Sequence, residues 1–210
     1  SPTNDIYVIG ITENAINDSS STDIFIRKYN NDGIEQNFSG TGSNTAPTCK
    51  SAGFPTRCSI NGKDLAIDLS NNSMDLYPYI AINSEGDIFV SFIGADFTTS
   101  TVYITIKKFD KDGNEIVTGW NKTYPVPQVS EFKGIAFDSD DNVYFAGYGT
   151  NLVSSSSGED WWIKKFDKNG TPLVFSQNMH QCDNGLYSSC TTDGKDYAYD
   201  GGQEDLDEVT

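Results

Sequence analysis

The stretch IKKFDKDGNEI, from Ile106 to Ile116, places oxygen-bearing side chains around a glycine in the manner of a calcium-binding loop. Asp110, Asp112 and Asn114 alternate along it, and carboxylate and amide oxygens are ligands that a hard cation prefers. Similar stretches occur twice more in the chain, so the metal-site interpretation can be tested on three copies.

The glycine spacing argues against a calcium loop in every copy. An EF-hand loop has its glycine at position six and a bidentate glutamate at position twelve. With Gly113 at position six, Lys108 occupies position one and Gly119 position twelve. The copies around Gly33 and Gly170 likewise begin on a lysine and end on a serine. The sequence therefore predicts structural turns at these glycines.

The residues before these glycines favour tight hairpins. The three dipeptides are Asp32-Gly33, Asp112-Gly113 and Asn169-Gly170. Such pairs accept positive φ at both central positions of a type I′ turn. Calcium could still bind near Asp138, Asp140 and Asp141, although a cluster of loop aspartates is more often a solvated turn. We expect no cofactor, and a structural calcium ion is the one exception left open.

Residues for catalysis are scarce in the sequence. His180 is the only histidine, and no nucleophile stands at a recognised spacing from it. Phosphate-binding loops, dinucleotide fingerprints and the G-x-S-x-G motif are absent from the sequence. The many carboxylates could serve a glycosidase as acid and base, but their abundance singles out no pair. We therefore expect no enzyme, and keep a hydrolase as the third alternative.

The four cysteines form two local pairs, Cys49 with Cys58 and Cys182 with Cys190. The absence of C-x-x-C and the single histidine leave a zinc site without its usual ligands. Two short disulfide loops are the favoured interpretation, and they indicate an oxidising compartment. The alternative is four reduced cysteines in a cytosolic protein.

The charge and hydropathy of the sequence argue against two classes of binding partner, nucleic acids and the interior of a membrane. Among 210 residues, 30 acidic and 14 basic side chains give a net charge of −16, which disfavours nucleic-acid binding. The longest apolar runs, such as Ile6–Ile11, are too short to span a bilayer, so we expect no membrane insertion. The opening SPTND has no signal-peptide features, as in a mature secreted chain or a trimmed one. We expect an extracellular or cell-surface location with the signal peptide removed.

The chain repeats itself three times. The central copies are IFIRKYNNDGIE from Ile24, ITIKKFDKDGNE from Ile104 and WWIKKFDKNGTP from Trp161. Each is preceded by a second shared segment, DIYVIG from Asp5, DIFVSF from Asp87 or NVYFAG from Asn142. Before the last two lies a third, YIAINSEG from Tyr79 or GIAFDSDD from Gly134. After each turn glycine comes a segment that ends in Phe38, Trp120 or Phe175.

Each repeat is therefore a module of strand, polar turn, strand, Ser/Thr-rich loop, strand, Gly turn and strand. The modules cover about residues 1–48, 75–128 and 129–181, with cysteine-bearing inserts at about 49–74 and 182–204. Four-stranded units at such periods are typical of propeller blades. We predict one all-β domain over residues 1–210, a β-propeller-like array of three four-stranded antiparallel modules with two disulfide-loop inserts.

The stretches DLYPYIAINSEGDIFVSF from Asp75 and GIAFDSDDNVYFAGY from Gly134 resemble the bacterial extracellular β-propeller repeats called SBBP repeats. The resemblance covers most of the chain outside the cysteine inserts. It implies a propeller fold and a secreted setting, and no catalytic set. Two family positions depart in the second module: Phe92 replaces a glycine and Tyr103 an acidic residue. The other modules keep these residues at Gly10, Gly147, Asp23 and Asp160.

Recognition residues are expected on one rim. The polar loops Thr12–Asp23 and Thr150–Asp160 would lie together there. Of the adjacent Trp161 and Trp162, on opposite faces of one strand, one should be buried and the other could stack on a sugar or contact a neighbouring subunit. Packing between sheets is the favoured role of both. The candidate rim residues are Ser155, Ser156, Ser157 and Trp162.

The two ends of the sequence match parts of a module. The tail EDLDEVT matches MDLYPYI when Asp205 is set on Asp75, and the head SPTNDIYV matches NSEGDIFV when Asp5 is set on Asp87. The tail would thus supply the first strand that the head lacks, either in the same chain or in a neighbouring subunit. A fragment of a longer array is the third explanation. The candidate contact residues are Asp5, Ile6, Tyr7, Val8, Leu206, Val209 and Thr210.

The leading hypothesis is a non-enzymatic extracellular structural protein that self-assembles into a cell-surface assembly or filament by pairing of edge strands. Its partners would be further copies of the chain, as a homo-oligomer or homopolymer. The alternative is a secreted β-propeller binding module that recognises glycans or surface proteins through the rim loops.

Overall fold

The computed structural model describes residues 4–13, 22–38, 64–67, 73–120, 122–125, 129–175, 179–182, 189–192 and 195–200. In these ranges the chain is all-β and contains no helix, hence none long and apolar enough to cross a membrane. The chain divides into two compact units, Ser1–Pro125 and Val126–Thr210. The single domain expected over residues 1–210 stays a prediction.

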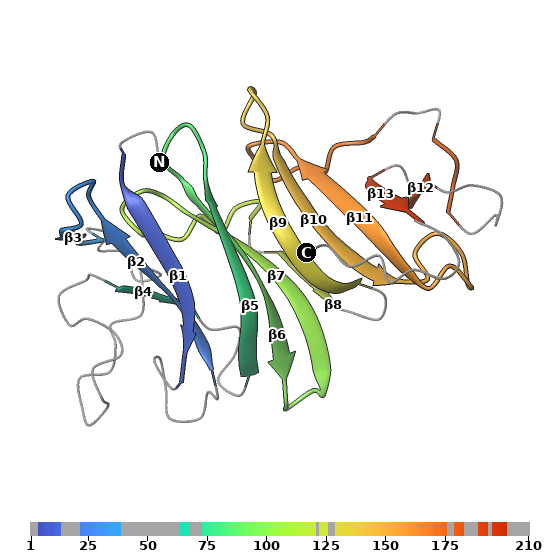
Figure 1. Ribbon diagram of the computed structural model, residues 1–210, viewed down its shortest axis with the longest axis horizontal. Helices are drawn as coiled ribbons and strands as arrows, with labels where there is room; N and C mark the ends of the chain where they lie inside the picture. The colour runs from blue at the N-terminus through green and yellow to red at the C-terminus, as the bar shows by residue number, and fades with distance from the viewer. Residues whose placement is uncertain are drawn as a thin grey trace. The chain divides into compact units, whose positions relative to one another are not determined.

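The first sheet belongs to unit 1. It contains β1 (Ile6–Thr12), β2 (Asp23–Tyr29), β3 (Glu35–Gln36) and β4 (Asp64–Ile67), and all pairs are antiparallel. Strand β2 lies at its centre, with β1 on one edge and β3 and β4 along the other. Among the described residues, β1 therefore pairs with one strand only (Figure 1).

The second sheet, also in unit 1, is an antiparallel meander. Its strands are β5 (Ser73–Ile82), β6 (Ile88–Asp96), β7 (Thr101–Phe109) and β8 (Lys122–Pro125), paired in chain order. Here β5 pairs with β6 from Ile82↔Ile88 to Ser73↔Asp96, with an irregularity between Leu76 and Tyr79. Strand β6 is the counterpart of β1, so the second sheet has the first strand that the first sheet lacks in its described part.

The third sheet lies in unit 2. It contains β9 (Val129–Phe137), β10 (Val143–Thr150), β11 (Glu159–Phe166), β12 (Ser189–Thr192) and β13 (Asp196–Tyr199). Its order is β12-β13-β11-β10-β9, so it has five strands in the described residues rather than the four expected. The extra strand β12 comes from the cysteine-bearing segment, which forms a hairpin with β13.

The fourth strand of a module does not directly follow the Gly turn, contrary to the sequence prediction. After the Gly turn of the first sheet, the chain forms the two-residue strand β3. After the Gly turns of the second and third sheets, it forms only a single β-bridge each, Phe109↔Glu115 and Phe166↔Pro172. The chain then leaves the sheet, and it buries Phe38 and Trp120. The strand that takes the fourth position of each sheet comes later in the chain and is β4, β8 or β13. Strands β4 and β13 belong to the segments that were expected to be inserts.

Each sheet has two faces that recur in register. We call leading face the one that carries Ile6 and Val8 on β1, and trailing face the one that carries Ile9 on β1 and Ile24 on β2. Leading-face residues of the second and third sheets include Ile88, Val90 and Phe92, then Val143, Phe145 and Trp162. Trailing-face residues include Ser91, Ile104 and Ile106, then Ala146, Trp161 and Ile163.

The core of unit 1 forms where the trailing face of the first sheet packs against the leading face of the second. Ile24 and Ile26 from β2 meet Ile88, Val90 and Phe92 from β6, and all five side chains are buried. Apolar burial of this kind is the main favourable term in folding. The alternation along each strand therefore serves sheet-on-sheet packing, because successive residues point to opposite faces.

Five hairpins in the described residues share one turn chemistry. A side-chain oxygen at the turn's first residue accepts hydrogen bonds from the backbone N–H groups two and four residues later. In the copy at Asp110, these come from Asp112 at 2.9 Å and Asn114 at 2.8 Å. The five capping residues are Asn30, Asn83, Asp110, Asp138 and Asp167. Such Asx turns make the acidic side chains structural.

The type I′ turn expected at Asp32-Gly33, Asp112-Gly113 and Asn169-Gly170 is wrong. Positive φ occurs at the glycine but not at the residue before it, as at Gly33 with φ of 76°. Hydrogen bonds join Asn30 to Ile34 across three intervening residues, which is a turn closed by a left-handed residue, as in a G1 bulge. At the hairpin of Asp138 the left-handed position is held by Asp141, with φ of 58°.

The departure at Phe92 has a steric explanation. In the first and third sheets, a glycine lies opposite an aromatic residue, Gly10 opposite Phe25 and Gly147 opposite Trp162. A Cβ on Gly10 would lie 2.8 Å from Cε1 of Phe25, so the ring covers the glycine. In the second sheet the sizes are exchanged, because Phe92 lies opposite Thr105.

We predict that Phe92→Gly costs about 3–5 kcal/mol of unfolding free energy, because it empties a fully buried site. The double variant Phe92→Gly/Thr105→Phe should recover much of this loss by supplying the ring from the neighbouring strand, as Phe25 does. Equilibrium urea unfolding followed by circular dichroism measures both. A double variant no more stable than Phe92→Gly would contradict the exchange.

Candidate functional site

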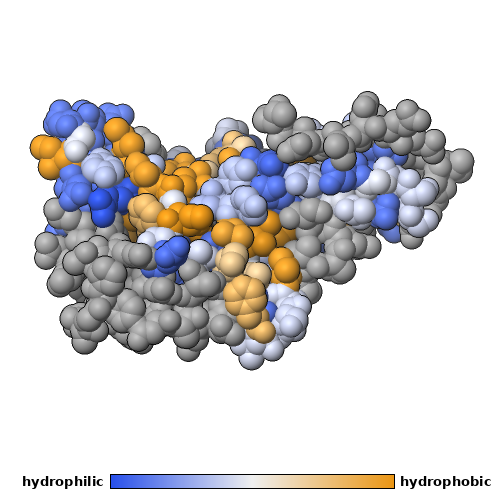
Figure 2. All heavy atoms as spheres, turned by 60° about the horizontal axis from the view of Figure 1, so that its bottom comes forward, coloured by the Kyte–Doolittle hydropathy of each residue, from blue (hydrophilic) through white to orange (hydrophobic). Residues whose placement is uncertain are grey.

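The outer edge of β1, which is unpaired within the part of the chain that the structure describes, is the first candidate site. Ile6 is 51 % exposed and Val8 44 %, whereas their counterparts Ile88 and Val90 are fully buried. Apolar side chains reach the surface among polar ones in the part of the view that shows β1 to β7, at the left and centre of Figure 2. Strand edges that present apolar residues are templates for pairing with another chain.

Two other predicted contact residues, Asp5 just before β1 and Tyr7 on it, belong to a polar cluster on the trailing face. Lys28 Nζ lies 3.0 Å from Asp5 Oδ2 and 5.5 Å from the centre of the Tyr7 ring. Burial raises the pKa of Tyr7. Burial alone would lower the pKa of Lys28, but its contacts with Asp5 and Tyr7 outweigh that effect and raise it. The contact residues Leu206, Val209 and Thr210 lie outside the described residues.

The same acid–lysine–aromatic cluster recurs in the second sheet. Lys108 Nζ lies 2.7 Å from Asp87 Oδ2 and 5.1 Å from the ring centre of Phe89. Trp120 closes the cluster, since its ring lies 4.8 Å from that of Phe89 and 5.9 Å from the ammonium group. The pair is almost fully buried here, so a structural role is sufficient to explain it.

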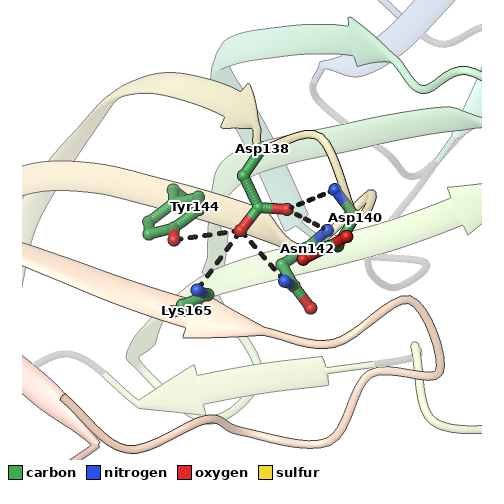
Figure 3. A network of polar contacts seen from close by, with 5 residues as sticks. All are labelled: Asp138, Asp140, Asn142, Tyr144 and Lys165. Atoms are coloured by element: carbon green, nitrogen blue, oxygen red, sulfur yellow. Dashed lines mark hydrogen bonds and ion pairs between the residues drawn. The ribbon is translucent and has the colours of Figure 1, made fainter.

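The cluster of the third sheet is more open and is built around Asp138 (Figure 3). Oδ1 of Asp138 accepts the backbone N–H groups of Asp140 and Asn142, which closes the turn. Oδ2 accepts from Asn142 Nδ2 at 2.9 Å, from the Tyr144 hydroxyl at 3.2 Å, and pairs with Lys165 Nζ at 3.3 Å. The ammonium group also lies 4.7 Å from the centre of the Tyr144 ring.

These contacts determine the electrostatics of the Asp138 cluster. The Asn142 side chain, the turn N–H groups and Lys165 hold the pKa of Asp138 well below its ordinary value of 3.8. The Tyr144 hydroxyl and Asp138 raise the pKa of Lys165. Both oxygens of Asp138 are thus engaged as acceptors. No group of three metal-ligating side chains occurs among the described residues.

A second cluster of the same composition lies on the trailing face of the third sheet. The Tyr148 hydroxyl donates to Glu131 Oε2 at 2.9 Å, and Lys133 Nζ lies 3.3 Å from the same oxygen. Lys133 also lies over the Tyr148 ring, 5.4 Å from its centre. Sequence reasoning missed this cluster, and at Asp138 it considered calcium rather than the contacts with Tyr144 and Lys165. Two features of the sequence could have indicated the Asp138 cluster. The position of Tyr144 is aromatic in every repeat, and the position of Lys165 is a lysine in every repeat.

The loop between β10 and β11 is organised by the buried Asp160. Its Oδ2 accepts the N–H groups of Leu152 and Val153, at 2.6 and 3.0 Å, and the Ser157 hydroxyl at 2.6 Å. This is the acidic position that the sequence analysis singled out, and its role is to close the loop. Among the rim candidates, Ser155 and Ser156 are exposed, whereas Ser157 is buried.

Trp162 does not lie on the rim. Its side chain is 6 % exposed and packs on the leading face, with its ring 5.2 Å from that of Phe132. The indole spans Gly147, where a Cβ would overlap the carbonyl oxygen of Glu131 and crowd the indole nitrogen. Its neighbour Trp161 is on the trailing face and is partly buried. Trp161, which is only partly buried, is therefore the member of the pair that reaches the surface.

The disulfide Cys182–Cys190 forms as predicted, with an S–S distance of 2.08 Å. Cys190 packs with Ala198 and with Val153 of the Asp160 loop in one buried cluster. The disulfide therefore supports the end of the third sheet where β12 and β13 join it. Cys49 and Cys58 lie outside the described residues.

No model of a known protein family matches this chain, and a comparison with curated proteins finds no match. The resemblance to the extracellular propeller repeats stays a prediction.

The pKa of Asp138 predicts a pH dependence of stability. Its folded pKa lies below the unfolded value, so its contribution is complete above about pH 4 and is lost as the pH falls further. Asp138→Asn should keep the turn, as Asn30 and Asn83 do, but remove this titration. Asp138→Ala should lose both the turn cap and the ion pair. We expect the order of thermal stability at neutral pH to be wild type, Asn, then Ala.

Thermal unfolding followed between about pH 5 and pH 2 tests this expectation. The Asp138→Asn variant should show a shallower fall in melting temperature than the wild type. The explanation fails if both proteins lose stability in parallel over this range.

Proposed function

We propose that this protein is a non-enzymatic structural subunit that assembles with copies of itself through the edge of β1. The observation that carries the proposal is the contrast at β1: its outer edge is unpaired among the described residues, and its leading-face side chains are exposed. The equivalent strands β6 and β10 are each paired on both sides. Their leading-face residues are buried.

The pairing of β5 with β6 supplies a template for the contact. Leu76 and Tyr79 of β5 lie opposite Ile93 and Ser91 of β6. Transferred through the sequence match of the tail, this register puts Leu206 opposite Ile11 and Val209 opposite Ile9. Thr210 then lies opposite Val8. The backbone hydrogen bonds of one added strand would supply affinity, as in other cases of strand addition.

Packing of sheet on sheet supports the same contact. In unit 1, the leading face of the second sheet is covered by the trailing face of the first. The leading face of β1 offers Ile6 and Val8 for a similar contact with an incoming copy. Because donor and acceptor surfaces differ, the contact is heterologous and produces a ring or a filament according to the rotation per subunit.

The propeller-like arrangement and the extracellular setting belong to this proposal. Three antiparallel sheets with a recurring register and a face-to-face contact in unit 1 fit consecutive propeller blades. The Cys182–Cys190 disulfide fits an oxidising environment outside the cell. Binding of glycans or proteins through the rim loops is the alternative, and it has only Ser155 and Ser156 exposed among its four candidate residues.

Electron microscopy and sedimentation across a concentration series test the proposal on the non-reduced chain. The wild type should form rings or filaments. A variant lacking Glu204–Thr210 and the variant Val8→Lys should both stay monomeric, because the first removes the donor strand and the second places a charge on the acceptor. Val102→Lys is the matched control, since Val102 is a similarly exposed valine on β7, a strand paired on both sides. It should assemble like the wild type.

A synthetic peptide with the sequence EDLDEVT separates strand addition from other kinds of association. It should bind the tail-deleted chain and should not bind the same chain carrying Val8→Lys. The proposal is wrong if the intact protein stays monomeric at every concentration, or if the tail-deleted chain assembles as well as the wild type.

A further inference from the structure

We infer that the trailing face of the third sheet binds carbohydrate, in the form of a flat β-linked polysaccharide chain. This face belongs to unit 2 alone, so the inference does not depend on assembly through β1. Three observations support it: a row of aromatic side chains, the aliphatic residues at the same positions of the other two sheets, and the polar groups beside the aromatic row.

The row crosses three neighbouring strands. Tyr148 on β10 lies opposite Trp161 on β11, which lies opposite Tyr199 on β13. Tyr148 and Trp161 are partly buried, and Tyr199 is 45 % exposed. Strands lie about 4.8 Å apart, so the row extends over about 10 Å, the length of about two sugar rings. Lys133 covers one side of Tyr148, which leaves Trp161 and Tyr199 as the open aromatic surfaces.

The same row is aliphatic in the first and second sheets. In the first sheet it consists of Ile11, Ile24 and Ile67, and the last two are buried against the second sheet. In the second sheet, its first two members are Ile93 and Ile104, both buried. The change to tyrosine and tryptophan in the third sheet therefore does not follow from packing between sheets.

The two faces of the third sheet also differ in the kind of aromatic residue they carry. The buried leading face holds the phenylalanines Phe132, Phe145 and Phe166. The trailing face, where only Tyr199 is exposed and the others are partly buried, holds Tyr144, Tyr148, Tyr197 and Tyr199 together with Trp161. Tyrosine and tryptophan combine an apolar ring with a polar atom, and they are suited to surfaces that are partly wet.

Polar groups and open space flank the row. Glu131 and Lys133 lie at its β9 end, where both engage Tyr148. The next row along the strands begins with Gly134 and Ala146, and a Cβ on Gly134 would meet no heavy atom within 4 Å. The aromatic row is thus bordered by small residues on β9 and β10, whereas Ile163 and Tyr197 continue the neighbouring row on β11 and β13.

These features match the chemistry of a sugar chain. Pyranose rings present apolar C–H faces that pack on aromatic rings, and their hydroxyl groups exchange hydrogen bonds with carboxylates and ammonium groups. Since Glu131 and Lys133 are paired with each other, they offer a neutral ligand both an acceptor and donors without an unbalanced charge. If this face packed against a sheet of another copy, we would expect isoleucines at these positions, as in the first sheet, which packs against the second.

Sedimentation with insoluble cellulose, chitin and xylan tests the inference on the full chain at a concentration where it is monomeric. We expect binding to at least one of the three. Trp161→Ala should weaken it at least about tenfold, as expected for a central aromatic contact, whereas Trp161→Phe should retain most of it. Phe97→Ala is the matched control, because Phe97 is an exposed aromatic side chain of unit 1.

Tryptophan fluorescence gives an independent readout. Of the three tryptophans, Trp120 and Trp162 are buried, so acrylamide quenches mainly Trp161. Soluble oligosaccharides of the polysaccharide that binds should protect it from quenching. Tyr199→Ala, at an exposed position of β13, should weaken binding as well, and it serves if Trp161→Ala does not fold.

The inference is overturned if none of the three polysaccharides binds, or if binding survives in both Trp161→Ala and Tyr199→Ala. It is also overturned if Trp161 becomes protected as the protein alone is concentrated, because a second copy then covers the row. Val8→Lys distinguishes this inference from the proposed assembly: it should abolish assembly and leave the sugar binding unchanged.

Discussion

Register is the constraint on which the three sheets depend, and one Asn or Asp side chain sets it at each of five hairpins. A slip of one residue would turn every side chain of a strand to the opposite face. The Asx cap prevents this by fixing which backbone N–H groups meet the turn, as Asp110 does for Asp112 and Asn114. Both the core of unit 1 and the aromatic row of the third sheet depend on that alternation.

Structural roles in turns, loops and ion pairs explain part of the acidic composition. Asp110 and Asp138 are turn caps, Asp160 closes a loop, and Asp5 and Asp87 pair with lysines beside aromatic rings. A carboxylate that accepts several N–H groups is stabilised in its charged form, which lowers its pKa. Many of the residues that suggest a metal site or an acid–base pair therefore have structural partners within their own hairpin.

The repeats are alike in backbone but differ in what their faces meet. The trailing face of the first sheet is aliphatic and buried against the second, whereas that of the third is aromatic and only partly buried. At β1 the difference concerns the edge, which lacks a pairing strand among the described residues. One scaffold can thus offer two separate surfaces, an edge suited to strand addition and a face suited to a flat polar ligand, because strand backbones and side chains point in perpendicular directions.

The sequence by itself determined the all-β class, the turn positions, the central strand pairs and the Cys182–Cys190 disulfide, because these depend on local alternation, on glycine and on short spacing. It did not determine the fourth strands, since β4 and β13 are distant in sequence and only tertiary pairing assigns them. Nor did it decide which of Trp161 and Trp162 is buried: alternation places them on opposite faces, but only packing against Phe132 shows which face is inside. The exchange of Phe92 and Thr105 likewise appears only when the strands are in register.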